Sequence, residues 1–463
     1  MKRCLASIIP VILLSGCVST SDLTGSTGTS NSPLYTNLQQ HNLDGAISFA
    51  QTESGFDPEK KSVDDQLWAM QAGLLYRMKG DFASSTNYFD MIEDVMYSED
   101  TENVLESGGE QIGSMLTNDT FLDYEQTLYD AVMVNTYKAI NFEALGDIAN
   151  ARVEWNRSDD RQRRAAEFFA KQINKSKEEL ENQKDDEDAE ASDIDKSVAS
   201  ANDLLAQQGI DMSGWKAYDG YVNPFSTFMH GLFFLRHAND AADIEKAIDS
   251  FERVVALTGS LAAKDTLDYA KSLRANPTAQ NDYLWVIIEN GEATQKEAFE
   301  INLPLYLVSS NINYAGVALP KLKEREETLG VFSVNDIQAT SVADMDRIIQ
   351  ADFKDKFPLI LTREITRTAI KTVAQKQIND HNPLLGLAAG FVQGLSTEAD
   401  TRSWSLLPKN FQAVMLPRPA DGRVKIAAEH LTTPLEVELT EPNAGVVYVK
   451  AMNPLVTPTI HLM

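Results

Sequence analysis

Two stretches of the chain share one spacing of small and aromatic residues. A small residue is followed three positions later by an aromatic one, then by a Gly-Asp pair, and finally by a small residue four positions before another aromatic. Small residues let two helices approach closely, aromatic rings fill the space beside them, and glycine can take the left-handed conformation that ends a helix. The pattern predicts helical hairpins that pack through Gly73, Tyr76, Gly80, Phe82 and Phe89 in the first copy and through Ala139, Phe142, Gly146, Ala151 and Trp155 in the second.

This spacing resembles the tetratricopeptide repeat, which has a period of 34 residues. A looser third copy has Gly231, Phe234, Ala247 and Phe251, and residues 44–47 are a candidate start of a fourth. The large separation between the second and third copies requires an insertion, which the charged run at residues 175–200 supplies. That run lacks the spacing of a calcium loop, so we expect a solvated helix and a linker there. The resemblance implies an acidic, tetratricopeptide-like domain over residues 34–276.

The N-terminus has the features of a secretory signal. Two basic residues precede an apolar run from Cys4 to Leu14, which is too short to span a bilayer. Residues 14–17, Leu-Ser-Gly-Cys, resemble a bacterial lipobox, which implies that residues 1–16 are removed and Cys17 is acylated. The alternative is an ordinary signal peptide with an incidental cysteine. By resemblance to bacterial lipoproteins, Val18 favours the outer membrane, and we expect the periplasmic face. Residues 17–33 are rich in Ser, Thr and Gly, which predicts a flexible tether.

Charge and cysteine content exclude several classes of function. The chain has 41 Lys and Arg against 68 Asp and Glu, and such an acidic chain is a poor ligand for nucleic acid. The acidic excess falls mostly before residue 283, because residues 283–463 carry 17 basic and 21 acidic side chains. Both cysteines, Cys4 and Cys17, precede the folded part. Disulfides and thiol-ligated metals are therefore not expected in it.

The pattern changes near Pro277 from helical periodicity to alternating, strand-like segments, which predicts a second, α+β domain over residues 277–463. Asn290-Gly291 is a turn signal after the first apolar run. A capping-box pattern at residues 341–344 predicts a helix start, and Pro358 predicts that this helix is divided. The predicted strands are Tyr283–Ile288, Ala298–Leu307, Tyr314–Leu319, Ser403–Leu407, Phe411–Leu416, Arg423–Ala427, Leu435–Leu439 and Val446–Met452. The whole chain is thus predicted to be α+β, with its helical repeats first.

No motif fixes a reaction. The histidines form no helix-borne zinc pair, and there is neither a nucleophile elbow nor a phosphate-binding loop. His230 lies beside a small residue of the third hairpin, which favours a packed histidine. Paired carboxylates are expected by chance in so acidic a chain, so they do not identify a hydrolase. We therefore expect no enzyme, no cofactor and no metal.

Three groups of residues have both a structural and a functional interpretation. Asp400, Arg402 and Trp404 are either an ion pair beside a packed ring, which we favour, or a sugar-binding surface. Arg363, Arg367 and Lys371 are either a solvated helix face, the favoured interpretation, or a contact for lipid headgroups or an acidic partner. A strip of glycines on a helix allows close approach of another helix within the chain, of a second copy, or of the membrane interface; these glycines are Gly386, Gly390 and Gly394.

Longer runs resemble a family of uncharacterised proteobacterial outer-membrane lipoproteins with tetratricopeptide-like repeats at the N-terminus. The runs are Leu116–Gln162, Ala318–Leu322, Val342–Ile348 and Ala399–Gln412. The resemblance implies no established reaction. We expect a non-catalytic scaffold or adaptor of the cell envelope that binds proteins or peptides through a helical-repeat surface and reaches the membrane through its lipid. The alternatives are a regulator that activates peptidoglycan synthesis and, last, an envelope hydrolase that uses carboxylates.

Overall fold

The computed structural model describes residues 32–101, 124, 126–164, 192–207, 210, 212, 215–218, 222–278, 282–307, 313–381, 399–440 and 444–463. Cys17, most of the tether and of the charged insertion, and Gly386, Gly390 and Gly394 lie outside these residues. Within them the predicted α+β class is confirmed, with helices first and most strands after residue 282. None of the described helices is both long and apolar enough to cross a membrane.

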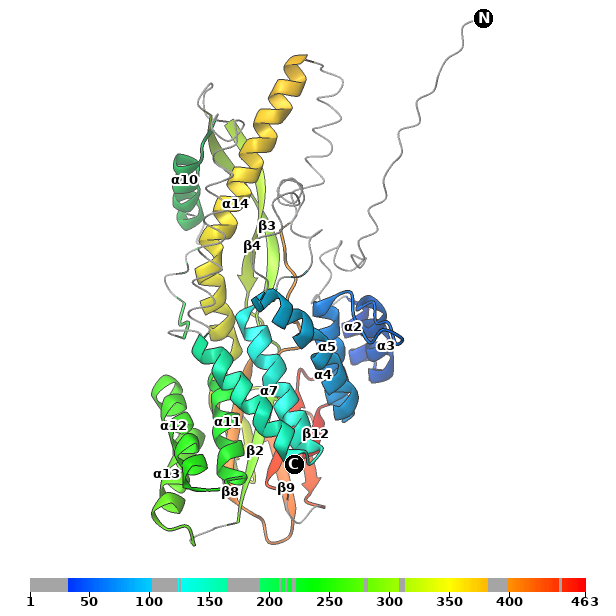
Figure 1. The fold of residues 1–463 in the computed structure, drawn as a ribbon, viewed down its shortest axis with the longest axis vertical. Coiled ribbons are helices and arrows are strands. Elements are labelled where there is room, and N and C mark those ends of the chain that lie inside the picture. Colours follow the sequence, from blue (N-terminus) through cyan, green and yellow to red (C-terminus); the bar gives the residue numbers. More distant parts are fainter. Residues whose placement is uncertain are drawn as a thin grey trace, which may run out of the picture.

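The molecule has a broad base and a long arm (Figure 1). The base holds most of the helices and two sheets, and the arm holds the longest helix beside a long β-hairpin. The base helices are α2 (Pro33–Gln39), α3 (Leu43–Glu53), α4 (Gln66–Lys79), α5 (Phe82–Thr101), α7 (Leu128–Ala144), a helix over residues 148–164, α11 (Pro224–Arg236), α12 (Ala241–Thr258) and α13 (Leu261–Ala275).

Three of the helix pairs are the predicted hairpins. Gly80, with φ of 82°, ends α4, and Gly146, with φ of 74°, lies between α7 and the helix over residues 148–164. Phe89 of α5 lies so close to Gly73 of α4 that a Cβ there would be 2.6 Å from the ring. Phe89 and Trp155 are fully buried, as predicted. In the third hairpin, a Cβ on Gly231 of α11 would be 2.9 Å from the Phe251 ring of α12.

A five-stranded sheet crosses the base between two apolar layers. Its strands, in spatial order, are β12 (Thr459–Leu462), β11 (Val446–Ala451), β2 (Tyr283–Asn290), β8 (Asn410–Pro417) and β7 (Thr340–Asp344). Strands β2 and β11 run parallel, and the other neighbours are antiparallel. Alternate residues of β2 pack into the two apolar layers. Trp285 and Ile287 face the helices, whereas Leu284, Val286 and Ile288 face a smaller sheet. This burial on both faces explains the continuous apolar run.

The smaller sheet covers the face of the five-stranded sheet that points away from the helices. Its order is β10 (Leu435–Glu438), β9 (Arg423–Ala428), β5 (Phe332–Val334) and β6 (Ile337–Gln338). The predicted boundary at residue 277 coincides with the change from helix to strand, since α13 ends at Ala275 and β2 begins at Tyr283. It does not coincide with a gap in packing, because the helices and the five-stranded sheet share one apolar cluster.

The arm joins parts of the chain that are far apart in sequence. It contains β3 (Gln295–Leu307), β4 (Asn313–Lys323) and α14 (Met345–His381), together with β1 (Ser192–Asp193) and α10 (Ile194–Gln207). Strand β1 pairs with the end of β3, and α10 packs on the same hairpin. A separate apolar cluster holds the arm together, with Leu303 from β3, Leu319 from β4 and Phe357 from α14 among its members. The C-terminal end of the predicted insertion is thus part of the arm.

Three local predictions differ from the structure. The helix predicted from the capping-box pattern exists, but it begins at Met345, where Asp344 Oδ1 accepts a 3.3 Å hydrogen bond from Arg347 N. Residues 341–344 themselves belong to β7, where Val342 and Ala343 are buried against the base helices. Pro358 does not divide α14: it is exposed, so water can reach the carbonyl that it leaves unbonded, and buried residues on both sides hold one continuous helix. Residues 403–407 are not a strand. The prediction also omitted β1, β5, β6, β7 and β12, of which only β7 exceeds four residues.

Candidate functional site

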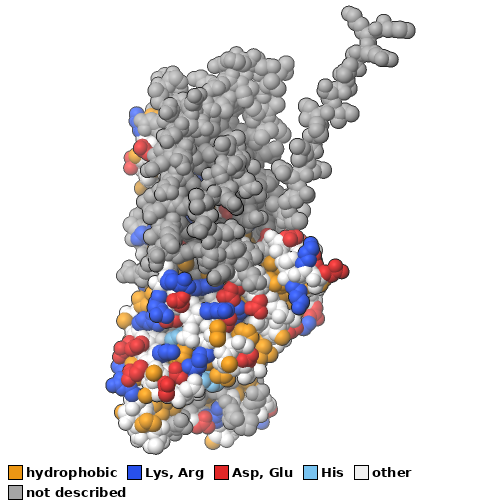
Figure 2. Space-filling model, viewed as in Figure 1, with side chains coloured by type: hydrophobic (Ala, Val, Ile, Leu, Met, Phe, Trp, Pro, Cys, Tyr) orange, Lys and Arg blue, Asp and Glu red, His pale blue; other side chains and the backbone are white. Residues whose placement is uncertain are grey.

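The inner helices α4 and α7 are the first helices of their hairpins and are buried along almost their whole length. Their outer partners, α5 and the helix over residues 148–164, carry the exposed charges. Figure 2 shows acidic and basic side chains interspersed on the lower part of the molecule, without a large area of one sign in that view. We call the sides of α2, α4 and α7 that point toward residues 402–407 the inner face.

A buried piece of the C-terminal part lies on this inner face, and it ends in a turn in which Leu407 N donates a 3.3 Å hydrogen bond to the Trp404 carbonyl. Residues 402–407, Arg-Ser-Trp-Ser-Leu-Leu, are all buried, yet they belong to no strand. We call them the docked segment. Tyr35 Oη of α2 donates a hydrogen bond of 3.0 Å to the Ser405 carbonyl, and Gln71 Nε2 of α4 donates one of 2.9 Å to Ser405 Oγ. The helices therefore hold this segment by side-chain bonds rather than by a backbone ladder.

Trp404 is the largest contact between the docked segment and the hairpins. Its ring meets Phe89 of α5 edge-on, with centroids 6.1 Å apart, and Tyr137 of α7 at 5.8 Å. Phe89 is one of the predicted repeat-packing residues, so the same ring that fills the first hairpin also contacts the docked segment. Three buried polar atoms at this contact have no hydrogen-bond partner among the described residues: Gln71 Oε1, Ser403 Oγ and Trp404 Nε1.

An ionic group lies on the sheet side of the docked segment. Lys450 Nζ of β11 lies 2.6 Å from Glu289 Oε2 of β2 and donates a 2.8 Å hydrogen bond to the Leu406 carbonyl. Tyr448 Oη donates to the other oxygen of Glu289 at 2.5 Å. Burial and the neighbouring Glu289 carboxylate raise the pKa of Tyr448 well above its usual value. Since both carboxylate oxygens are bonded, Glu289 is a structural ion and not a free acid or base.

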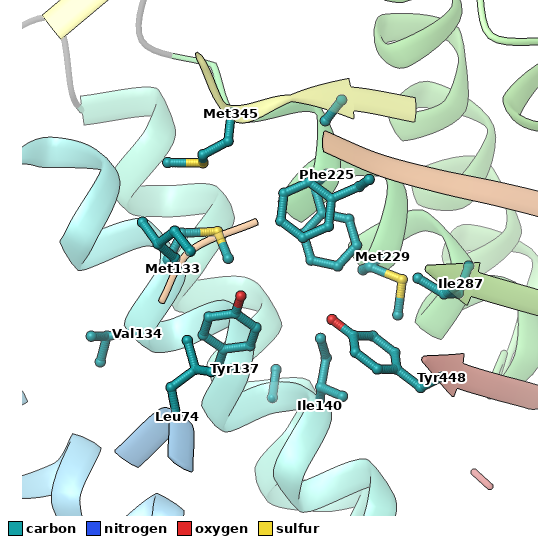
Figure 3. Close-up of a cluster of buried hydrophobic side chains, with 14 of the residues drawn as sticks. Leu74, Met133, Val134, Tyr137, Ile140, Phe225, Met229, Ile287, Met345 and Tyr448 are labelled. Atoms are coloured by element: carbon teal, nitrogen blue, oxygen red, sulfur yellow. The ribbon is translucent and has the colours of Figure 1, made fainter. Parts of the chain in front are cut away.

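Arg77 of α4 joins the hairpins to this ionic group. Its guanidinium lies 4.6 Å from the Tyr448 ring centroid and 5.2 Å from that of Tyr137, and Nη1 donates to Asn141 Oδ1 at 2.7 Å. Figure 3 shows Tyr137 on α7 and Tyr448 on β11 reaching into the same apolar cluster from opposite sides. Burial, followed by the Arg77 charge, lowers the pKa of His461 to about 4. These contacts fix the first two hairpins on the sheet.

Tyr35 ties the beginning of the folded chain to the docked segment. Arg325 Nη1 donates to Tyr35 Oη at 3.2 Å and also pairs with Glu292 Oε1 at 2.6 Å. Burial raises the pKa of Tyr35 to about 12, so its hydroxyl stays protonated and can donate to Ser405. The end of the predicted tether is therefore fixed next to residue 405.

The other predicted residues have structural roles where the structure describes them. Arg402 Nε pairs with Asp400 Oδ1 at 3.0 Å and Trp404 packs, so the favoured interpretation of this group is confirmed. Burial raises the pKa of Asp400, but the bonds to Arg402 lower it overall. Arg367 is buried and pairs with Glu364 at 2.6 Å, which corrects the expectation of a solvated face there. The Lys371 side chain lies outside what the structure describes.

Two further buried groups resemble reactive sites, but their side chains are paired at contacts between helices. His230 Nδ1 lies 2.9 Å from Ser250 Oγ between α11 and α12, and burial lowers the pKa of His230 to about 4. Both side chains are buried at the helix contact. Lys138 of α7 is buried among Asp90, Glu93 and Glu154; burial lowers its pKa, but these carboxylates raise it overall. The His230 pair joins two helices, and the Lys138 group joins three, namely α5, α7 and the helix over residues 148–164.

A cavity lies apart from the docked segment, between the start of α7 and the start of α14. It measures about 360 Å³ including its open mouth, and its walls are mostly apolar. Its lining residues are Leu128, Tyr129, Val132, Tyr218, Val222, Asn223, Ile348, Ala351 and Asp352. Among the residues that the structure describes, no group of three or more His, Cys, Asp or Glu could hold a metal ion.

Sequence reasoning missed the docked segment because its alternating pattern was interpreted as a strand. A signal was nevertheless present. Glu289 and Lys450 are charged residues inside otherwise apolar strand runs, and such residues are rarely buried without a partner. No family model matches the sequence, and no curated protein matches it as a relative.

Proposed function

We propose that this protein is a non-catalytic, lipid-anchored scaffold of the bacterial outer membrane that binds protein partners through its helical hairpins. The observation that carries the proposal is the docked segment, since the inner face of the hairpins already holds a hexapeptide by side-chain bonds and a buried tryptophan. Stacked helical repeats form concave surfaces that bind other protein segments. Such binding needs no reactive group.

The N-terminal features support the location. The lipobox-like residues 14–17 and the Ser-rich tether precede a folded body that begins with Ser32 as the cap of α2. A tether of about 16 residues has a root-mean-square span of roughly 20–24 Å. The hairpins would therefore lie close to the membrane, where a partner in the envelope can reach them.

Site-specific photocrosslinking in intact cells tests this function. A photoreactive residue replaces Leu145 or Val153, which are 50% and 45% exposed on the second hairpin, and in the control it replaces Leu455, which is 60% exposed in the segment between β11 and β12. We expect a discrete protein adduct from the hairpin positions, absent at Leu455 and lost when Cys17→Ser releases the chain from the membrane. Absence of any adduct, or equal adducts at all three positions, would contradict the proposal. If the captured partner is a peptidoglycan synthase, the scaffold is a regulator of that enzyme.

A further inference from the structure

We propose that the docked segment is an internal ligand, which a partner's segment of the same chemistry displaces from the inner face. This inference rests on the proposed function, because it names the class of partner that the hairpins would bind. The partner segment is a peptide with a large aromatic residue between two small polar residues, followed by two aliphatic residues, and it turns there as residues 404–407 do.

The contacts of the docked segment define this chemistry. Phe89 and Tyr137 stack on each other, and the ring of Trp404 packs edge-on against both. Gln71 bonds a small hydroxyl residue next to it, and the two carbonyls that follow accept from Tyr35 and Lys450. Leu406 and Leu407 are buried in the same apolar cluster. Because two of the polar bonds go to backbone carbonyls, a different chain can form them without sharing the sequence.

The polar groups of the docked segment are less well satisfied than those of the strand that follows it. Residues 410–417 pair with β2 along their whole length in an antiparallel ladder. In the docked segment, by contrast, Ser403 Oγ and Trp404 Nε1 have no hydrogen-bond partner among the described residues, and neither has Gln71 Oε1 opposite them. Each buried, unbonded polar group costs free energy. When the segment leaves, water can bond Ser403 Oγ and Trp404 Nε1, and a ligand with a donor for Gln71 Oε1 satisfies the third atom. Both changes favour exchange of the internal segment for the external one.

The segment can leave without removing a strand from either sheet. Within it, the backbone bond to the rest of the base is the one from Ala293 N to the Leu407 carbonyl, at its last residue. Upstream residues 399–402 likewise belong to no strand, whereas downstream β8 is fixed between β2 and β7. The geometry therefore allows residues 402–406 to swing away on a pivot at residues 407–409 while the five-stranded sheet stays intact.

Hydrogen exchange on the soluble chain that begins at Val18 is the first test, and it uses no variant of the folded part. We expect the amides of Trp404, Ser405 and Leu406 to exchange through local opening, at least about tenfold faster than those of Val447 and Val449 in β11. Equal protection of both sets would mean that the segment is a permanent part of the core, with ordered water on its unbonded atoms, and would overturn the inference.

Binding of a peptide in trans is the second test. A fluorescent peptide with the sequence of residues 401–409 is added to the same soluble chain and to its Trp404→Ala variant, which weakens the internal segment. We expect the variant to bind the peptide at least about tenfold more tightly than the unmodified chain, and a peptide with Ala in place of Trp to bind neither. The matched control is Phe353→Ala, which removes a buried ring from the arm cluster and leaves the inner face intact.

Equal affinities of the Trp404→Ala and Phe353→Ala variants, or no binding to a folded Trp404→Ala variant, would overturn the inference. Both tests use only this chain and a peptide, so their failure leaves the scaffold proposal standing. Failure of the cellular crosslinking would contradict the scaffold proposal, but it would not change the results of the hydrogen-exchange and peptide-binding tests.

Discussion

Phe89 lies against Gly73 across the first helical hairpin, so closely that an added Cβ at residue 73 would be 2.6 Å from Phe89 Cε1. This contact explains why the hairpin needs a residue without a side chain at position 73. A methyl group there would push away a ring that also touches Trp404 of the docked segment. The first hairpin and the docked segment are therefore coupled through one aromatic side chain.

Gly73→Ala is the first prediction. Although alanine favours helix more than glycine does, overpacking against a buried ring costs about 1–3 kcal/mol, so we expect a net loss of stability. Urea unfolding of the soluble chain measures it. The control is Gly316→Ala at an exposed position of β4, where the atom nearest to the added Cβ would lie at 3.6 Å and little change is expected. An unchanged or raised midpoint for Gly73→Ala would refute the close contact.

The second prediction concerns the shared core. Trp155 is fully buried, and Trp155→Ala in the full chain should cost about 3–5 kcal/mol. Since the helices and the five-stranded sheet belong to one apolar cluster, residues 34–276 expressed alone should lack a cooperative unfolding transition. Circular dichroism during urea titration measures both. A fragment that unfolds cooperatively would show that the helical part is an independent domain.

The third prediction concerns the buried pair of Glu289 and Lys450. Lys450→Met removes the paired ammonium and leaves the buried Glu289 carboxylate without its ion-pair partner, which should cost about 3–5 kcal/mol. In the double variant with Glu289→Gln the charge is gone, and we expect at least half of that loss to return. A thermodynamic cycle from urea midpoints tests this. A double variant less stable than Lys450→Met would contradict the explanation.

The fourth prediction is a pH dependence. The folded-state pKa of His230 lies near 4, below the usual 6.5, so the unfolded chain binds a proton there more readily than the folded one. This difference in pKa does not change the free energy of unfolding above about pH 6.5. Below that pH the folded state loses stability until about pH 4, by about 3 kcal/mol in total. His230→Asn should flatten the stability profile between pH 6.5 and 4, whereas an unchanged slope would assign the effect to other groups.

The fifth prediction concerns the anchor. Cys17→Ser should abolish cleavage after Gly16 and incorporation of labelled palmitate, because the acylated thiol is lost. Membrane fractionation and intact mass of the protein measure this. Retention of the variant in the membrane fraction at an unchanged mass would contradict lipidation at Cys17.

Local patterns in the sequence predicted the local parts of the fold. Gly80 and Gly146 marked hairpin turns because positive φ is a property of the residue itself, and the two-residue alternation of β3 and β9 marked strands with one buried face. Long-range relationships could not be predicted. Nothing near residue 192 indicates that β1 pairs with Leu307, more than a hundred residues later.

The candidate site depended on such long-range relationships. Residues 403–407 have a strand-like pattern, and only the distant Tyr35, Gln71 and Lys450 decide that their polar groups bond side chains instead of a neighbouring strand. In the same way, tertiary burial overrode two helix signals. Residues 341–344 pair with β8, and Phe353 and Phe357 hold α14 continuous past Pro358.

The position of β11 inside the five-stranded sheet has a consequence for truncation of the chain. β2 is flanked by β8 on one side and by β11 on the other. Without residues 446–451 one edge of β2 would lose its backbone hydrogen bonds, and Glu289 would lose both Tyr448 and Lys450. The same loss would open both apolar clusters, because Val446 and Tyr448 belong to the one that β2 shares with the helices and Val447 and Val449 to the other. A chain shortened to residue 445 would therefore expose apolar surface in both layers at once, so the two layers depend on one short strand.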